Sequence, residues 1–232
     1  MKVSVIIPVR DGALYIASAI ESVLGQTEPP AELLVIDDGS KDETASIVSR
    51  FSSRGVRLIQ QPPSGAAAAR NAGVKLARYE LLAFLDADDL WTSTKLEQQC
   101  AELQSDPSLD VVFGHVRQFV SPDVEAAKPA RLRCPNESVP GYLAGTMLIR
   151  CESFERVGVF ETGWAIGEFL AWYARAQLLG LREKMILTVL LMRRLHRTNQ
   201  GILKRSEHGD YVRVMKKILD RRRESEAKLT SL

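Results

Sequence analysis

Three carboxylates lie within four residues at Asp86, Asp88 and Asp89, directly after the apolar run 81–85. Because neighbouring like charges repel one another, a chain that places them at the end of a buried strand needs a compensating cation. Mg²⁺ or Mn²⁺ suits this position, since such hard ions accept few protein oxygens and complete their coordination with water and phosphate. The cluster therefore predicts a metal-bound diphosphate substrate, whereas on its own it would be interpreted as a solvated turn that caps a helix.

A second acidic segment follows another apolar run, because residues 33–36 lead into Asp37 and Asp38. Ser40 and Glu43 then have the spacing of a capping box, which predicts that a helix begins there. Open α/β sheets bind their ligands at the carboxyl ends of their strands, so both acidic segments are expected at one edge of a sheet.

The apolar pattern predicts the elements that position these acids. Strands are expected at 3–7, 33–36, 56–60, 80–85, 111–120, 146–149 and 185–192. Helices are expected around 16–24, 42–53, 66–77, 96–106 and 167–179. This alternation predicts an α/β fold with three layers and a mostly parallel central sheet. The proline-containing segment 121–141 is expected to be a long loop.

Length and composition favour a single domain, since 232 residues with 45% hydrophobic content can bury one large core. Residues 1–192 carry 19 Lys and Arg against 24 Asp and Glu, whereas residues 193–232 carry 12 against 5. A mildly acidic body therefore precedes a basic tail. Within the tail, residues 206–228 are expected to form an amphipathic helix that packs on the body or on a second subunit in a homodimer; peripheral contact with an anionic membrane is the alternative. We expect no nucleic-acid partner.

Cysteine usage and hydropathy predict a cytoplasmic protein. Cys100, Cys134 and Cys151 are odd in number and lack metal-ligand spacing, which favours a reducing compartment. The apolar run 3–9 is too short for a signal peptide, and 185–192 falls far below the ~20 apolar residues of a membrane span. No transmembrane segment is therefore expected.

Five segments, in this order, resemble the motifs of the family 2 glycosyltransferases, which have the GT-A fold. They read VSVIIP at 3–8, SVLGQT at 22–27, VIDDGS at 35–40, ARNAG at 69–73 and FLDADD at 84–89. The resemblance implies a GT-A (Rossmann-like) three-layer α/β/α domain over 1–232 with a C-terminal helical tail. Its parts would be a nucleotide-sugar-binding half at 1–120, an acceptor and lid half at 121–203 and the basic tail at 204–232. It also implies an enzyme that transfers a sugar from a nucleotide-sugar to an unknown acceptor, usually with inversion.

The resemblance assigns a first group of residues to the nucleotide. Pro8, Val9 and Arg10 would line the nucleoside pocket, where Arg10 stands in place of an aromatic residue common in the family. Asp38 would accept a hydrogen bond from the base, and Arg70 would help to hold the nucleotide. UDP is the expected nucleotide.

The same resemblance divides the acidic cluster between the sugar and the metal. Asp86, with Ala87 beside it, would face the ribose or the donor sugar. Asp88 would bind Mn²⁺ or Mg²⁺ on the diphosphate as the second acid of a DxD motif.

Residues 193–199, which read RRLHRTN, resemble the lid segment of the family. His196 would complete the coordination of the metal. Arg194 and Arg197 would clamp the diphosphate, because guanidinium groups pair well with phosphate oxygens.

The segment 167–175 resembles the acceptor side of the family but lacks acids that relatives carry, since Phe169 and Ala171 occupy those positions. Glu168 is the candidate catalytic base, and a positioned carboxylate supplies typically about 10²–10⁴-fold in rate. Alternatively, Glu168 pairs with Arg175 or caps a helix.

Two other functions stay open at this point. A nucleotidyltransferase shares the architecture but typically has a glycine-rich phosphate loop after the first strand, which residues 8–12 lack. A catalytically silent nucleotide-sugar-binding protein is suggested by Phe169 and Ala171.

Overall fold

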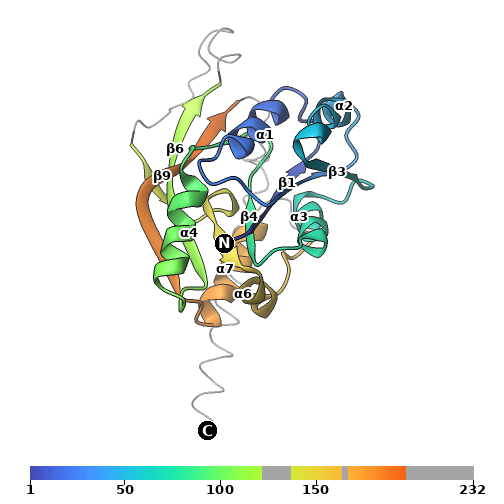
Figure 1. Cartoon of the computed structure of the whole chain (residues 1–232). Coiled ribbons are helices and arrows are strands. Elements are labelled where there is room, and N and C mark those ends of the chain that lie inside the picture. Colours follow the sequence, from blue (N-terminus) through green and yellow to red (C-terminus); the bar gives the residue numbers. More distant parts are fainter. Residues whose placement is uncertain (122–136, 164–166, 197–232) are drawn as a thin grey trace.

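The computed structural model describes residues 1–121, 137–163 and 167–196. Its described strands form one sheet in the order β3-β2-β1-β4-β8-β6-β9-β5, with β7 paired to β6 (Figure 1). The strands are β1 (Val3–Val9), β2 (Glu32–Asp37), β3 (Val56–Gln60), β4 (Leu81–Phe84), β5 (Leu90–Trp91), β6 (Val111–Val120), β7 (Val139–Gly141), β8 (Leu148–Arg150) and β9 (Glu183–Leu195). The helices are α1 (Ile16–Leu24), α2 (Thr44–Ser49), α3 (Ala66–Leu76), α4 (Lys95–Ser105), α6 (Cys151–Val157) and α7 (Glu168–Leu178).

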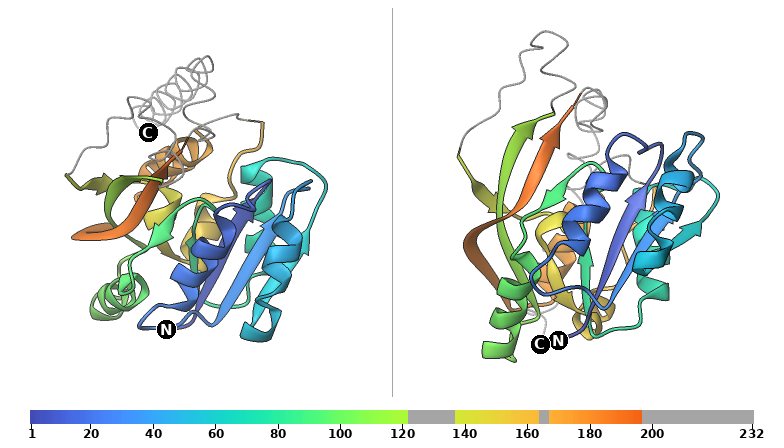
Figure 2. Two further views of the ribbon diagram at one scale, coloured as in Figure 1. Left: turned by 90° about the horizontal axis from the view of Figure 1, so that it is seen from above. Right: turned by 45° about the horizontal axis from the view of Figure 1, so that its top comes forward.

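Helices cover both faces of the sheet, which gives the three expected layers (Figure 2). Side chains of α1, α2 and α4 share one apolar core with one face of the strands. Side chains of α3, α6 and α7 share a second core with the opposite face. Because both faces are covered, every residue of β1 and β2 is buried, as is typical of parallel strands. The predicted α/β class with three layers is confirmed.

The sheet is parallel in one half and mixed in the other, so the expectation of a mostly parallel sheet was too broad. Strands β3, β2, β1 and β4 are parallel neighbours. Beyond β4, strand β8 runs antiparallel to both β4 and β6. Antiparallel neighbours need no long crossover helix, so the strand–helix alternation of the first half does not extend to this region. The short elements β5, β7 and α6 were not predicted, because two to seven residues carry little periodicity.

The strand directions bring two distant segments to one edge of the sheet. Both β4 and β6 run antiparallel to β8, so they point the same way, and β9 is parallel to β6. The carboxyl end of β9 therefore lies at the same edge as the carboxyl end of β4. Residues 86–89 and 194–196 meet there, although more than a hundred positions separate them.

The predicted capping box does not form. Helix α2 begins at Thr44, and its N-cap, Glu43, makes no side-chain capping bond. Instead, the Ser40 hydroxyl accepts a hydrogen bond from the backbone N–H of Asp11 at 2.9 Å, and Asp42 accepts one from Ala13 at 3.0 Å. These side chains join the loops after β1 and β2, and this tertiary pairing replaces the local cap.

Lys95 on α4 is a buried cation in the core behind the acidic cluster. Its side chain is inaccessible to solvent, and its Nζ lies 4.4 Å from the centre of the Trp91 ring. The ammonium also contacts Gln99 and lies 3.5 Å from the backbone oxygen of Thr146. Within the described ranges no carboxylate forms an ion pair with it. Burial lowers the pKa of Lys95 to about 7.

This depressed pKa predicts a stability that rises with pH. Between pH 7 and pH 9 the unfolded chain still holds the Lys95 proton while the folded protein has released it, so raising the pH favours folding. The unfolding free energy should rise by about 2 kcal/mol from this group. The measurement is guanidinium denaturation at both pH values. Burial raises the pKa of Cys100 to about 11, so its thiol titrates near pH 9 only in the unfolded chain and opposes the rise; comparison with Lys95→Met, which retains Cys100, cancels this contribution. Lys95→Met should remove the rise and exposed Lys75→Met should retain it; an unchanged pH dependence in Lys95→Met contradicts the prediction.

Candidate functional site

Arg70 on α3 lies between two carboxylates from different parts of the chain. Its Nη2 is 2.6 Å from Oδ1 of Asp86, and its Nη1 is 2.7 Å from Oε1 of Glu168. The Arg70 side chain is only 6% exposed, so both ion pairs are shielded on its side. Burial by itself would lower the pKa of Arg70, but the charges of Asp86 and Glu168 raise it above its ordinary value. The guanidinium thus stays charged and joins the turn after β4 to the first residue of α7.

Asp88 and His196 form a second polar pair at this edge. Nε2 of His196 lies 2.8 Å from Oδ2 of Asp88, and the His196 side chain is nearly buried. The ring of Tyr15 packs against the imidazole with a centroid distance of 4.7 Å. The structure therefore brings together the two residues predicted to bind a metal.

The end of β9 is fastened to the acidic turn by Arg194. Its backbone N–H donates to Oδ1 of Asp89 at 2.8 Å, and its Nε donates to the backbone oxygen of Asp88 at 2.8 Å. The guanidinium also lies over the rings of Tyr15 and Phe119, at 4.8 Å from each. Burial raises the pKa of Asp89 well above its ordinary range, and the charges of Asp88 and Asp86 raise it further.

Asp38 organises the loop that precedes α3. It is buried, and its carboxylate accepts hydrogen bonds from Gln61 at 2.7 Å and from the backbone N–H groups of Ser64 and Gly65, both at 2.8 Å. The sequence did not indicate these partners, because they lie more than twenty residues away.

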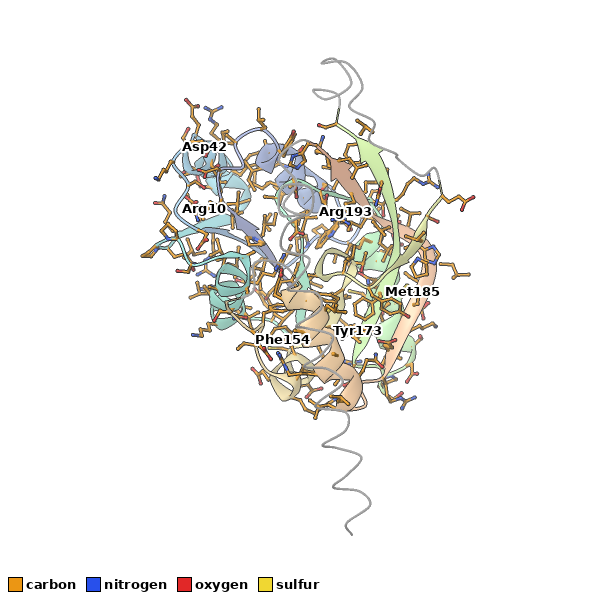
Figure 3. All side chains as sticks on the ribbon, turned by 180° about the vertical axis from the view of Figure 1, so that it is seen from behind. Arg10, Asp42, Phe154, Tyr173, Met185 and Arg193 are labelled. Carbon is orange, nitrogen blue, oxygen red and sulfur yellow. The ribbon has the colours of Figure 1, made fainter. Side chains whose placement is uncertain are left out.

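The other residues predicted to bind the nucleotide surround this edge. Pro8 and Val9 are buried at the end of β1, beside Ile36 and Asp37 of β2. Arg10 is half exposed in the loop that follows, and Figure 3 shows it at the same end of the molecule as Arg193. Ala87 packs against the core that contains α1 and α4. Arg197 lies outside the described residues.

Neither alternative for Glu168 is correct. Arg175 pairs with Glu161 at 2.6 Å, and within the part of the chain that the structure describes no side chain caps the helix α7. Glu168 is held by Arg70 instead. Ala171, which stands where relatives carry an acid, is buried at 4% exposed, and Phe169 stacks on Tyr173.

Sequence reasoning missed the role of Asn71, the neighbour of Arg70 on α3. Its Nδ2 donates to the backbone oxygen of Phe160 at 2.8 Å, and its Oδ1 accepts from the backbone N–H of Phe160 at 3.0 Å. Two consecutive residues of α3 therefore hold the segment that leads into α7. Only the ARNAG motif itself marked this position.

The family model for glycosyl transferase family 2 matches residues 4–158. The chain belongs to this family. An uncharacterized glycosyltransferase of Rickettsia typhi is 31% identical to it over 170 residues, which are 68% of this chain and 53% of the relative. The E. coli enzyme named UDP-Glc:alpha-D-GlcNAc-diphosphoundecaprenol beta-1,3-glucosyltransferase WfgD is 37% identical over 130 residues, 52% of this chain and 51% of WfgD. The chain thus spans about half the length of these two relatives.

A crystal structure of S. aureus TarS in complex with UDP-GlcNAc has the same fold as this family 2 chain. The TM-score is 0.71 at 20% identity, over 86% of this chain and 60% of TarS. The GT-A fold expected from the sequence motifs is confirmed. None of the helices in the described ranges is long and apolar enough to cross a membrane.

Proposed function

We propose that this family 2 glycosyltransferase transfers a sugar from a UDP-sugar to an acceptor hydroxyl, with inversion at the anomeric carbon and with Mn²⁺ or Mg²⁺ as cofactor. The proposal rests on one arrangement: Asp88, which pairs with His196 at the end of β9, lies on the same four-residue turn as Asp86, which Arg70 joins to Glu168. The pair that we propose as metal ligands and the candidate base are thus connected through adjacent residues. Family membership and the names of WfgD and TarS support a UDP-sugar as donor.

The chemistry of Asp88 and His196 fits a divalent ion that retains other ligands. Among the described residues, no group of three or more His, Cys, Asp or Glu side chains could hold a metal alone. Mg²⁺ is usually held by one or two carboxylates together with water and substrate phosphates, and imidazole is also a ligand for transition metals. When bound there, the ion would neutralise the charge that accumulates on the leaving diphosphate.

The chain's own residues would hold the donor and receive the proton. Asp38 keeps the loop before α3 in place, and Arg70 holds Asp86 in one orientation toward the donor. The acceptor oxygen bonds to the anomeric carbon while the bond from that carbon to the diphosphate oxygen breaks. The acceptor proton passes to Glu168, whose second carboxylate oxygen is not the one paired with Arg70. We also propose the division of the chain that the sequence motifs imply, in which residues 1–120 bind the donor and residues 121–203 bind the acceptor.

Donor turnover tests this function. The protein is incubated with UDP-glucose, UDP-galactose, UDP-GlcNAc or GDP-mannose, and nucleotide release is followed with Mn²⁺, with Mg²⁺ and with EDTA. We expect release from a UDP-sugar that stops in EDTA and returns when Mn²⁺ is added in excess. Absence of both nucleotide release and Mn²⁺-dependent UDP binding in calorimetry would contradict the proposal.

A silent nucleotide-sugar-binding protein is the second candidate, and the aromatic and aliphatic side chains of Phe169 and Ala171 at acid positions favour it. The same assay separates the two functions. A transferase releases UDP slowly even to water, whereas a silent binder binds the donor in calorimetry and leaves it intact.

A further inference from the structure

Four aromatic rings gather beside Glu168, and we call this group the aromatic platform. It consists of Phe113 on β6, Tyr142 after β7, and Phe169 and Tyr173 on α7. Tyr142 lies 5.4 Å from Phe113 and 5.2 Å from Tyr173 between ring centroids. Phe169 stacks on Tyr173 with an angle of 11° between the ring planes. Figure 3 shows Tyr173 on the side of α7 that faces β6 and β9, where Met185 lies.

The aromatic platform is open to solvent, unlike the aromatic group next to it. Phe84, Phe154, Phe160 and Trp172 also contact one another, and each of them is at most 1% exposed. In the platform only Phe113 is fully buried; Tyr142 is 42% exposed, and Phe169 and Tyr173 are partly exposed. The inner group accounts for core packing on this side of the sheet. Aromatic rings left at the surface beside a binding site are typical of ligand contact.

The platform is continuous with the candidate site. Phe169 directly follows Glu168, and Glu168 is joined through Arg70 to Asp86. Consecutive residues of a helix do not face the same side, so a ligand lying on Phe169 would bring only its edge toward the candidate base. This is the position that an acceptor must occupy, because its hydroxyl has to reach both the base and the donor sugar.

Polar groups accompany the rings. The Tyr173 hydroxyl lies 2.9 Å from Glu183, and burial together with that carboxylate raises the pKa of Tyr173, so the hydroxyl keeps its proton. Glu183 also accepts a hydrogen bond from Gln177 at 2.7 Å. These groups would suit a ligand that has hydroxyls around an apolar face.

His115 adds an unused polar atom on the same face of the sheet. Val112 and Val116 of β6 belong to the opposite core, so alternation along the strand places His115 on the side of Phe113. Nε2 of His115 is buried and has no hydrogen-bond partner among the described residues, while Nδ1 lies 3.3 Å from the Ser138 hydroxyl. A buried polar atom without a partner is costly, and a ligand hydroxyl would satisfy it.

We propose that the aromatic platform binds a sugar ring of the acceptor, so that the attacking hydroxyl belongs to a carbohydrate. One face of a pyranose consists of C–H groups that pack on aromatic rings, while its hydroxyls point outward to polar side chains. An alkyl chain would use the rings but would leave Nε2 of His115 without a hydrogen-bond partner. The inference rests on the proposed transferase function for the reaction, although binding of the sugar to the platform does not.

The test combines binding with turnover. Methyl glycosides of glucose, galactose, mannose and GlcNAc are compared with octanol, first by saturation-transfer NMR and then as acceptors. We expect at least one glycoside to bind, and Tyr142→Ala to weaken its binding and lower the ratio of transfer to donor hydrolysis by about tenfold. Tyr142→Phe, which keeps the ring, should retain most of both, and Leu187→Ala, at an exposed residue of β9, should resemble the wild type.

Each outcome decides for or against the aromatic platform. Glycoside binding that is lost in Tyr142→Ala and kept in Tyr142→Phe supports it, even where no donor is turned over and the proposed transferase function fails. Absence of glycoside binding, binding unaffected by Tyr142→Ala, or transfer to octanol alone overturns it. In those cases continued metal-dependent donor hydrolysis leaves the transferase function intact.

Discussion

Replacing Arg70 by methionine is expected to lower donor turnover by about 10²–10³-fold, the largest effect of any single change outside the acidic turn. The guanidinium bridges Asp86 and Glu168 with two bonds of 2.6 and 2.7 Å. Without it, the two carboxylates repel each other. Asp86 and Glu168 then no longer keep the positions from which they would contact the donor and accept the proton. The measurement is the steady-state rate of UDP release with Mn²⁺.

The stability of the Arg70→Met variant should fall less than its activity. Loss of one partner from a buried pair is strongly destabilising, but Asp86 remains about half exposed, so water can solvate its charge. We expect a loss of about 1–3 kcal/mol in guanidinium denaturation. A fall in activity explained entirely by unfolding at the assay temperature would contradict a role for Arg70 in the site.

Two further variants distinguish charge from geometry. Arg70→Lys keeps the charge, yet one ammonium cannot reproduce the planar fork that reaches two separate carboxylates. We expect it to fold and to recover only part of the activity. Arg54→Met is the matched control, since it breaks an exposed pair with Glu21 of the same 2.6 Å length, and exposed pairs contribute little to stability.

The parallel half of the fold was predictable because its signals are local. The run Val3–Val9 is wholly buried, every position in it is apolar apart from Ser4, and a helix with an apolar face follows it. The mixed half carries weaker signals. β5 and β8 contain two and three residues, and their place in the sheet depends on pairing with distant strands.

The site was predictable where a motif carries the information, and not where a tertiary contact does. The acids after β4 and the histidine after β9 were found from their motifs, and the strand directions bring Asp88 and His196 to 2.8 Å. The predicted pairing of Glu168 with Arg175 was wrong. Sequence reasoning considered only a nearby cation, whereas the actual partner, Arg70, is 98 positions away. Ser40 failed as a cap for the same reason: its hydroxyl bonds to a neighbouring loop.

Changing Asp88 to asparagine should remove metal-dependent nucleotide binding while leaving the fold intact. The amide oxygen of asparagine can still accept a hydrogen bond from His196, which replaces the 2.8 Å contact that the Asp88 carboxylate makes. The negative charge that would hold Mn²⁺ is lost. We expect Mn²⁺-dependent affinity for UDP to fall by about 10²-fold or more in calorimetry, with UDP release falling in parallel. Asp106→Asn, an exposed carboxylate at the end of α4, is the control.

The stability of Asp88→Asn separates a metal ligand from a structural residue. Asp86, Asp88 and Asp89 repel one another, and this repulsion contributes to the raised pKa of Asp89. Removing one charge should leave the metal-free protein as stable as the wild type or slightly more stable, as is common where function maintains unfavourable charge. Addition of Mn²⁺ with UDP should then raise the melting temperature of the wild type alone. A variant that is less stable without metal, and that still binds UDP with Mn²⁺, would show that Asp88 serves to anchor His196 rather than to bind the ion.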